Sequence, residues 1–241
     1  MATKRIALVT GANKGLGFEI CRQLAQQGFI VLLGARDEGR GRAAAFQLTS
    51  EGLDVRFILL DMEKPSTFQM ASRCITGEFG QLDVLINNAG FAIDWDYKAD
   101  SVPLDMIRQT FETNFFGLID LTQRLLPLIR QSPAGRIVNQ SSGLGSLTLH
   151  STPNTGLEHL KAFAYNASKT ALNAFTVHLA DALQGTSIKV NSAHPGDVKT
   201  DANPRGEMSV KDGAKTAVAL ALLPSDGPSG GFFHLGQPLP W

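Results

Sequence analysis

The sequence predicts an α/β fold, a single doubly wound domain with a seven-stranded, mostly parallel sheet and helices on both faces. Short apolar, β-branched runs alternate along the chain with longer segments of helical period. These runs lack the polar alternation of a half-exposed sheet, which indicates strands covered on both faces. The runs are Ile6–Val9, Phe29–Leu33, Val55–Leu60, Leu82–Ile86, Arg136–Val138, Ile188–Ala193 and, more weakly, Gly231–His234. Ligands of such sheets bind beyond the carboxyl ends of the strands.

The helical segments end at glycines or contain residues that disturb a helix. The first long helix, which follows the first strand, stops at Gly28. The segment 103–131 contains Asn114, Gly117 and Pro127, which should bend or loosen it.

A third long helix is predicted over 163–184, ending at Gly185. The stretch 143–161 is the one long irregular region. Long loops inside compact domains are usually lids or binding segments, so we expect it to border the ligand site.

Length and composition restrict the class of protein. The 241 residues contain no repeat, linker or low-complexity tract, so we expect one domain over 1–241. Lys plus Arg equals Asp plus Glu at 22 each, so no basic excess indicates a nucleic acid partner. No apolar run approaches the ~18 residues of a membrane span, and the chain enters its first strand without a signal-like segment. We therefore expect a soluble cytoplasmic protein.

Cysteine and histidine spacing indicates no metal centre. Cys21 and Cys74 lie in predicted helices without a CxxC spacing, which favours two reduced thiols. The five histidines show no paired ligand spacing.

The stretch "TGANKGLG", residues 10–17, joins the first strand to the first helix. Gly11, Gly15 and Gly17 permit positive φ angles and close backbone approach, and the following helix directs its free N–H groups at the turn. A pyrophosphate is the expected ligand, as in Rossmann-type domains. The pattern is neither a P-loop nor GxGxxG. The alternative is a glycine turn that only packs strand on helix.

The nature of the nucleotide is indicated about twenty residues further on. An NAD-binding domain places an acidic residue there to accept the ribose 2′-OH. This chain has Arg36 instead, and Lys14 can reach the same side, so the two cations favour a 2′-phosphate and hence NADPH. In the alternative reading, Lys14 and Arg36 are surface charges and Asp37 supplies the acid one position late.

The stretch "YNASK" places Tyr165 and Lys169 four residues apart on one helix face. A free phenol has a pKa of about 10 and is a poor proton donor near neutral pH. A neighbouring cation lowers that pKa, and a shift of ~3 units corresponds to roughly 4 kcal/mol.

Six motifs occur in the order found in the short-chain dehydrogenase/reductase family. They are "TGANKGLG", "NNAG" at Asn87–Gly90, "TNFFG" around Asn114, "NQSS" ending at Ser142, "YNASK" and "HPGDVKT" at His194–Thr200. The chain resembles this family over nearly its whole length and is most similar to the NADPH-dependent carbonyl reductase branch.

The resemblance implies four catalytic residues. Tyr165 would protonate the carbonyl oxygen, and Ser142 would hydrogen-bond the same oxygen. Lys169 would lower the phenol pKa and bind the nicotinamide ribose, and Asn114 would hold a water of a proton relay. The alternatives are a structural Ser142 and an Asn114 that only bends its helix.

The resemblance also implies a cofactor site for NADPH/NADP+. Asp61 would accept from the adenine amino group, the backbone of Asn88–Gly90 would lie near the adenosine ribose, and Val198 with Thr200 would contact the carboxamide. The expected set is Gly11, Asn13, Lys14, Gly15, Leu16, Gly17, Arg36, Asp61, Met62, Asn88, Ala89, Gly90, Tyr165, Lys169, Pro195, Gly196, Val198 and Thr200.

Two departures from the family pattern affect the substrate side. Ser142 and Tyr165 are 23 positions apart, where the family commonly has about a dozen, so the intervening loop must bulge outward. The tail "FFHLGQPLPW" is also unusual. Trp241 would either reach the substrate mouth or pack on the surface.

The expected function is NADPH-dependent reduction of ketones or aldehydes to alcohols. Apolar residues near the cleft predict a small apolar carbonyl substrate, namely Phe91, Ile93, Trp95, Leu144 and Leu147. The alternatives are a non-catalytic NADP(H)-binding regulatory protein and an NAD(P)-dependent alcohol dehydrogenase working oxidatively. A hydrolase is disfavoured because no GxSxG motif surrounds Ser142. For this chain we expect a dimer or a tetramer, with a monomer as the alternative. The resemblance implies that family members which pair the segments 103–131 and 163–184 are tetramers and that members with longer insertions can be monomers.

Overall fold

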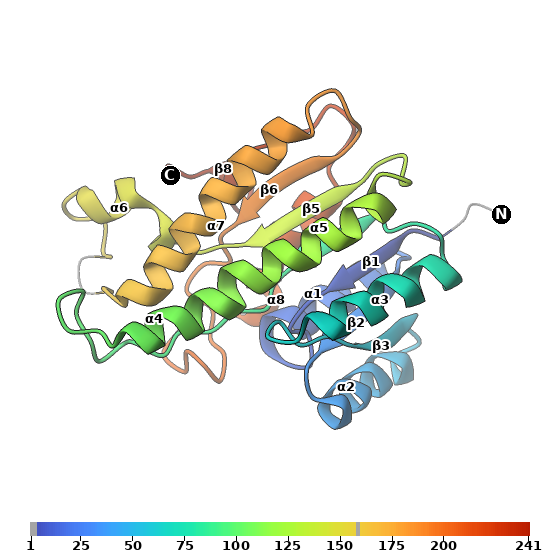
Figure 1. Cartoon of the computed structure of the whole chain (residues 1–241), viewed down its shortest axis with the longest axis horizontal. Coiled ribbons are helices and arrows are strands. Elements are labelled where there is room, and N and C mark those ends of the chain that lie inside the picture. The colour runs from blue at the N-terminus through green and yellow to red at the C-terminus, as the bar shows by residue number, and fades with distance from the viewer. Residues whose placement is uncertain (1–3, 158–159) are drawn as a thin grey trace.

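The computed structural model describes residues 4–157 and 160–241 and contains one sheet with the strand order β3-β2-β1-β4-β5-β6-β7-β8 (Figure 1). Strands β1 to β7 pair in parallel, and β8 pairs antiparallel with β7. The strands are β1 (Ile6–Val9), β2 (Ile30–Ala35), β3 (Val55–Leu59), β4 (Val84–Asn87), β5 (Arg136–Gln140), β6 (Lys189–Ala193), β7 (Phe232–His234) and β8 (Gln237–Pro238). The order reverses between β1 and β4, which creates a crevice at the carboxyl ends of these strands.

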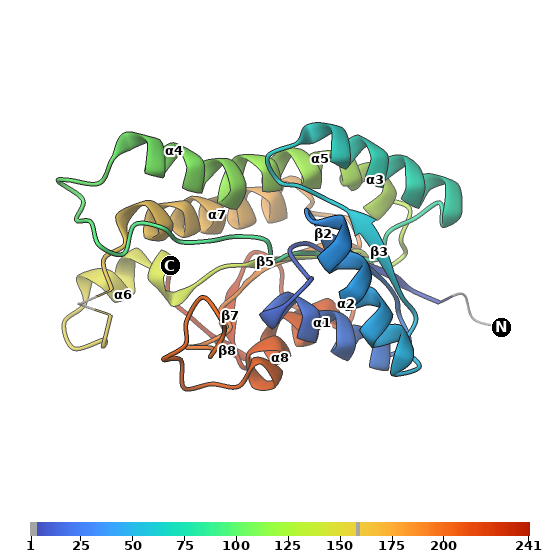
Figure 2. The same cartoon turned by 90° about the horizontal axis from the view of Figure 1, so that it is seen from below.

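Helices cover both faces of the sheet, with α1, α2 and α8 on one side and α3, α4, α5 and α7 on the other (Figure 2). The helices are α1 (Gly15–Gln26), α2 (Glu38–Ser50), α3 (Pro65–Glu78), α4 (Leu104–Phe111), α5 (Gly117–Ile129), α6 (Leu147–Ser151), α7 (Phe163–Ala182) and α8 (Val210–Ala221). Two apolar layers result, one on each face. Leu24 and Leu48 belong to the first, and Phe68 and Leu125 to the second. Burying each such side chain stabilises the fold by roughly 1.5–3 kcal/mol.

The doubly wound parallel sheet is confirmed, with one strand more than expected. All seven predicted strands form, and the tail adds β8 through a two-residue turn in which Leu235 and Gly236 have φ angles of 46° and 80°. The sequence did not indicate β8 because Pro238 normally disfavours a strand. An edge strand tolerates it, since no neighbour requires its missing N–H.

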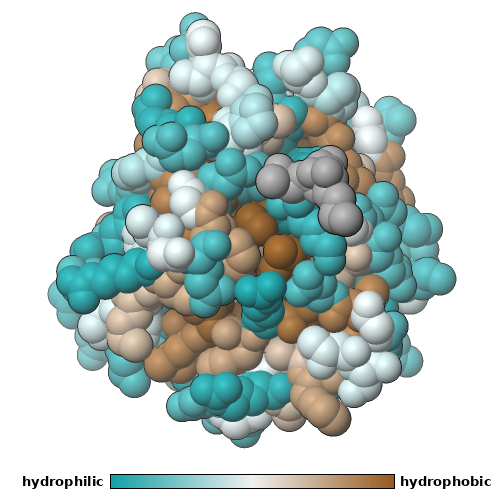
Figure 3. Space-filling view, turned by 90° about the vertical axis from the view of Figure 1, so that its right-hand side faces the viewer, coloured by the Kyte–Doolittle hydropathy of each residue, from teal (hydrophilic) through white to brown (hydrophobic). Residues whose placement is uncertain are grey.

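The strands begin at the end of the molecule that lies opposite the carboxyl-end crevice, and the N-terminus lies at this same end. Hydrophilic side chains cover most of this end, with apolar side chains between them (Figure 3).

The predicted loosening of segment 103–131 takes the form of a π-helical turn. Residues Glu112–Phe116 form this turn, η1, between α4 and α5, and Pro127 lies inside α5. Gly117 packs directly on the backbone of Met62, and a Cβ at Gly117 would overlap the Met62 carbonyl oxygen. The disturbed helix therefore turns Asn114 inward while α5 approaches the end of β3 closely.

A chain of buried polar side chains fastens α5 and α7 to the sheet. Asn87 Nδ2 donates to Thr122 Oγ1 on α5 at 3.0 Å and to Asn139 Oδ1 on β5 at 2.9 Å. Asn139 Nδ2 donates to Thr176 Oγ1 on α7 at 2.8 Å, and that hydroxyl lies 2.8 Å from Ser192 Oγ on β6. Buried polar groups need such partners, so these bonds favour one position of each helix on the sheet.

The stretch 143–161 is less irregular than expected. It contains a short 3₁₀ turn, η2 (Gly143–Gly145), and helix α6. Positions 158–159 lie outside the described residues. The two short helices are each capped by a serine hydroxyl, Ser142 for η2 and Ser146 for α6.

The C-terminal tail packs against these short helices. Trp241 stacks on Phe232 with ring centroids 5.5 Å apart, and the Trp241 carbonyl accepts from the Thr148 amide at 2.9 Å. Trp241 is 37% exposed and packs beside α6, and whether it also borders the substrate stays a prediction. His194, after β6, accepts from the Gly143 amide through Nδ1 at 3.1 Å. Burial, reinforced by His234, lowers the pKa of His194 to about 4.

The depressed His194 pKa predicts a pH-dependent stability. The folded state binds fewer protons than the unfolded state between pH ~6.5 and ~4, so the free energy of unfolding falls as pH drops through this window. We expect a loss of at most about 3 kcal/mol from this group. His194→Asn keeps an acceptor for Gly143 and should flatten the dependence in urea unfolding at pH 7 and 4.5. His178→Asn, on the exposed face of α7, is the control and should leave the slope unchanged.

The Gly117 contact predicts opposite effects of alanine at two helical glycines. Gly117→Ala should destabilise the protein by roughly 1–3 kcal/mol, because α5 must move away from the Met62 carbonyl. Gly77→Ala, in α3 with open space around it, should stabilise by about 0.5–1 kcal/mol through helix propensity. Denaturant midpoints measure both, and equal effects would contradict the close approach.

Candidate active site

The glycine turn after β1 has the backbone that the sequence predicts. Gly11 and Gly15 have φ angles of +62° and +57°. A Cβ at Gly11 would lie 2.8 Å from Ala89 Cα, and one at Gly17 would lie 2.5 Å from Asn88 Nδ2. The first two glycines are therefore required by their φ angles, and Gly11 and Gly17 also by close packing.

The segment after β4 holds this turn in place. Thr10 Oγ1 accepts from the amides of Asn88 and Ala89 at 2.9 and 2.8 Å. Asn88 Nδ2 donates to the carbonyls of Thr10 and Gly11 at 2.8 and 3.2 Å. The "NNAG" motif and the glycine turn are thus one hydrogen-bonded unit, in which the side chain of Asn88 is bonded to the backbone of the turn.

The residues expected at the 2′-phosphate have different environments. Lys14 Nζ pairs with Asp201 Oδ2 at 2.9 Å, and both side chains are exposed. Arg36 is exposed and has no ion pair within the part of the chain that the structure describes. Asp37 accepts from the Arg40 amide at 2.8 Å and thereby caps α2, which accounts for this carboxylate without a ribose contact.

Asp61 and Met62 follow β3, at the carboxyl ends of the strands, as the glycine turn follows β1. Asp61 Oδ1 accepts from the Glu63 amide at 3.2 Å, and Oδ2 pairs with Lys64 Nζ at 3.3 Å. Met62 is buried beneath Gly117.

The segment after β6 faces the glycine turn across a cavity of about 430 Å³. Its lining residues are Gly15, Lys199, Thr200, Asp201, Pro204 and Val210. Gly196 has a φ angle of +91°, and buried Val198 bridges to Met208. This segment contains four of the predicted cofactor residues, Pro195, Gly196, Val198 and Thr200. It lies beside the glycine turn, and two further predicted residues, Asn13 and Leu16, belong to that turn.

The four expected catalytic residues come from three elements that meet at the carboxyl ends of β4 and β5. Ser142 follows β5, Asn114 lies in η1, and Tyr165 and Lys169 lie one turn apart on α7. The side chain of Ser142 lies close enough to the Tyr165 hydroxyl to act on its pKa, in the lowering direction. Lys169 Nζ donates to the Gln140 carbonyl at 2.8 Å and lies 5.6 Å from the centroid of the Tyr165 ring.

Asn114 is fully buried and bonded to protein groups. Its Oδ1 accepts from the Phe91 amide at 3.0 Å, and its Nδ2 donates to the Phe91 carbonyl at 2.9 Å and to Ser168 Oγ at 3.1 Å. A Cβ at Gly90 would lie 3.1 Å from Asn114 Oδ1 and 3.3 Å from Lys169 Nζ. A side chain at position 90 would therefore crowd both the Asn114 amide and the Lys169 ammonium.

Burial dominates the proton affinities of this cluster. It raises the pKa of Tyr165, and the side chain of Ser142 acts in the opposite direction. Burial also lowers the pKa of Lys169 to about 8, which still leaves an ammonium at neutral pH. Lys169 is not among the causes of the raised Tyr165 pKa, and the lowering of the phenol pKa by Lys169 stays a prediction.

Sequence reasoning missed three residues that hold the cluster together. They are Gln140, whose carbonyl fixes Lys169, Ser168, which bonds Asn114, and Asp94, which accepts from backbone amides of α7. A carboxylate inside the otherwise apolar stretch "FAIDW" was the available signal for Asp94.

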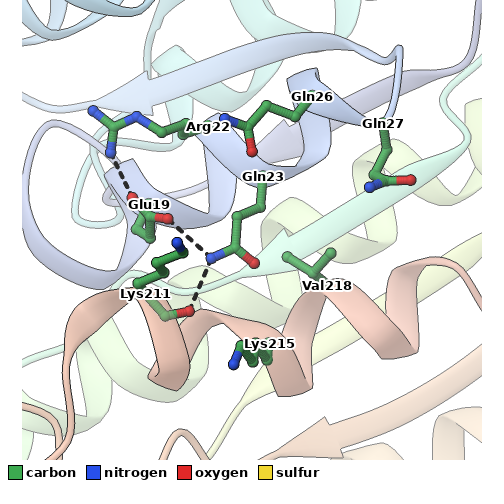
Figure 4. A pocket seen from close by; sticks show the side chains of 8 residues that line it. All are labelled: Glu19, Arg22, Gln23, Gln26, Gln27, Lys211, Lys215 and Val218. Atoms are coloured by element: carbon green, nitrogen blue, oxygen red, sulfur yellow. Dashed lines mark hydrogen bonds and ion pairs between the residues drawn. The ribbon is translucent and has the colours of Figure 1, made fainter.

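A second cavity, of about 400 Å³, lies between α1 and α8 on the opposite face from α7 (Figures 2 and 4). Glu19 there accepts from Arg22 and Gln23, and Gln23 donates to the Lys211 carbonyl. These polar groups satisfy one another, and none is a predicted site residue.

Across 4–157 and 160–241, no group of three or more His, Cys, Asp or Glu side chains could hold a metal ion. In the same ranges, no helix has the length and apolar character that crossing a membrane requires.

Comparison with known proteins identifies relatives that span the whole chain. The short chain dehydrogenase family model matches residues 5–208. Short-chain dehydrogenase/reductase 1 of Saponaria officinalis is 37% identical, covering 100% of this chain and 97% of the relative. Carbonyl reductase (NADPH) 1 of Mus musculus is 36% identical, with 100% and 99% covered.

Solved structures agree with this result. NADPH-bound carbonyl reductase from chicken fatty liver has a TM-score of 0.87 at 26% identity, with 99% of both chains covered. Salutaridine reductase from Papaver somniferum has a TM-score of 0.83 at 32% identity, covering 95% of this chain and 99% of that one. With its motifs, its sheet order and these relatives in agreement, the chain belongs to the short-chain dehydrogenase/reductase family.

Proposed function

We propose that this protein reduces ketones and aldehydes to alcohols with NADPH and that Tyr165 supplies the proton. The observation that carries the proposal is that Ser142, Tyr165 and Lys169 lie together at the carboxyl ends of the central strands, on the side of the sheet where the glycine turn lies. The names of the relatives support it, because several are carbonyl reductases that use NADPH.

The residues present fit the dinucleotide. The turn at Gly11–Gly17 leaves a backbone cradle at the N-terminus of α1, where a Cβ at Gly15 would meet only Thr200 at 3.8 Å. Free helical N–H groups and the helix dipole favour a pyrophosphate there. Arg36, with Lys14 released from its exposed pair with Asp201, would hold a 2′-phosphate. Such exposed pairs contribute only about 0–1 kcal/mol, so a phosphate can replace Asp201.

The proton chemistry follows from the environment of the phenol. Bound NADPH supplies a hydride to the carbonyl carbon. Because burial raises the pKa of Tyr165, its hydroxyl carries a proton at neutral pH, but donation to the carbonyl oxygen requires that the phenolate be stabilised. Ser142 can donate a second hydrogen bond to that oxygen. The Lys169 ammonium then stabilises the phenolate, and the hydrogen bond to the Gln140 carbonyl keeps this ammonium in position.

The same environment favours reduction over the alternatives. An enzyme that works oxidatively needs Tyr165 as a base, and a raised pKa makes the phenolate scarce at neutral pH. A purely regulatory NADP(H)-binding protein has no use for the combination of Ser142, Tyr165 and Lys169.

The surroundings of Tyr165 support an apolar carbonyl substrate. Trp95 lies with its ring centroid 6.0 Å from that of Tyr165 at an interplanar angle of 38°, and 51% of Trp95 is exposed. Ile93 and Leu147 are also exposed, and the Leu144 amide donates to Ser142 Oγ. A flat or cyclic ketone can contact such a surface while its oxygen reaches the phenol.

Replacing the proton donor should abolish turnover. Tyr165→Phe should lower kcat for ketone reduction by about 10²–10⁴-fold, because Ser142 provides only a hydrogen bond to the carbonyl oxygen and the proposed proton donor is lost. The dissociation constant of NADPH should change less than about twofold. The measurements are the loss of reduced-nicotinamide absorbance with a panel of cyclic and aromatic ketones and a fluorescence titration of NADPH. The chain has one other tyrosine, and Tyr97→Phe is therefore the matched control. A Tyr165→Phe enzyme with more than a tenth of normal activity would refute the assignment.

Removing the cation at the proposed 2′-phosphate should change cofactor choice. Arg36→Ala should weaken NADPH binding by about 10- to 100-fold, the value of one or two hydrogen bonds between charged groups, and leave NADH binding unchanged. Arg40→Ala, also exposed and four residues away, should affect neither. Wild-type preference for NADH would overturn the NADPH proposal.

A further inference from the structure

Asp94 is a fully buried carboxylate in the segment that leads from β4 to α4. Its exposed fraction is 0%, whereas Asp96, two residues later, is exposed. Asp94 forms no ion pair within residues 4–157 and 160–241. Instead, Oδ2 accepts from the Ala164 amide at 2.6 Å, and Oδ1 accepts from the Tyr165 amide at 3.4 Å. A buried carboxylate is costly unless it is hydrogen-bonded, so these two amides account for its position.

The two amides belong to the first turn of α7. The first N–H groups of a helix have no partner within it, and a side chain before the helix usually caps them. Ala162, the residue at that position, has no capping side chain. Asp94 caps α7 from 70 positions away in the sequence, and its charge is favourable at the positive end of the helix dipole.

The neighbours of Asp94 contact both Asn114 and Tyr165. Phe91 is held through its amide and its carbonyl by the side chain of Asn114, and Trp95 lies against the ring of Tyr165. The segment 91–95 is thus fixed to η1 at one end and to the start of α7 at the other.

We propose that Asp94 is a positioning residue for Tyr165. It fixes the first turn of α7 so that the phenol meets Ser142, and it holds Trp95 against the phenol ring. Lys169, one turn further along, is fixed independently by the Gln140 carbonyl. Loss of the Asp94 cap therefore displaces Tyr165 relative to both Ser142 and Lys169. The catalytic part of this inference rests on the proposed role of Tyr165 as proton donor.

The kinetic test compares Asp94→Ala and Asp94→Asn with Asp96→Ala. A displacement of about 1 Å at a reacting group can cost up to about 100-fold in rate, so we expect Asp94→Ala to lower kcat by about 10- to 100-fold. Asp94→Asn retains an acceptor for the Ala164 amide and should recover most of that loss. The dissociation constant of NADPH should stay within about twofold for all variants. Asp96 has no hydrogen bond or ion pair among the described residues, and its alanine variant should behave as wild type.

Two results would overturn the proposal. One is a kcat within about twofold of wild type for a folded Asp94→Ala. The other is a parallel loss of kcat and of NADPH binding, which indicates a general structural role. If Asp94→Ala does not fold by circular dichroism, Asp94→Asn decides the question. Its kcat should then fall by at least about threefold with NADPH binding retained, and an unchanged kcat would overturn the proposal.

A spectroscopic measurement tests the positioning without turnover. The chain has two tryptophans, so a Trp241→Phe background leaves Trp95 as the sole reporter. Adding Asp94→Ala, or Asp94→Asn if the alanine variant does not fold, should raise acrylamide quenching of Trp95. Adding Asp96→Ala should not. Unchanged quenching would overturn the placement of Trp95 by Asp94. If the wild-type protein reduces no ketone, the proposed function fails, and this measurement still decides whether Asp94 holds the segment.

Discussion

The parallel register of β4, β5 and β6 is the constraint on which the candidate site depends. Asn87 lies beside Asn139 in this register, and Asn139 lies beside Ser192. Hydrogen bonds extend the alignment to Thr176 on α7. A slip of one residue would turn these side chains to the other face and leave buried amides without partners. The polar layer therefore specifies where α7 lies on the sheet, and through it where the phenol and the ammonium lie.

Desolvation is the second physical factor in the site. The Lys169 ammonium is buried with the Gln140 carbonyl as its hydrogen-bond partner, and desolvation lowers its pKa. The same burial keeps Tyr165 protonated. In the proposed reaction, the neutral phenol gives up its proton as the carbonyl oxygen gains negative charge, and the buried Lys169 ammonium stabilises the phenolate that forms. Charge stabilisation of this kind is stronger in a partly dry site than in water.

The motif residues were predictable because the chemistry of each depends on its own residue type. Gly11 and Gly15 need positive φ angles, and Tyr165 and Lys169 share a helix face at four-residue spacing. The groups that support them were not predictable. Gln140 acts through a backbone carbonyl that any residue could supply, and β8 forms at an edge where Pro238 is tolerated.

By itself, the sequence determined the alternation of buried strands and helices, the glycine turn and the identity of the motif residues, since hydrophobic period and local backbone requirements are properties of short segments. Only the tertiary structure decided that Asp94 caps a helix 70 positions away, that Asp37 caps α2, and that Trp241 packs beside α6. Such partners are chosen when the sheet brings distant segments together, because a buried polar group accepts whichever donor the packing places within reach.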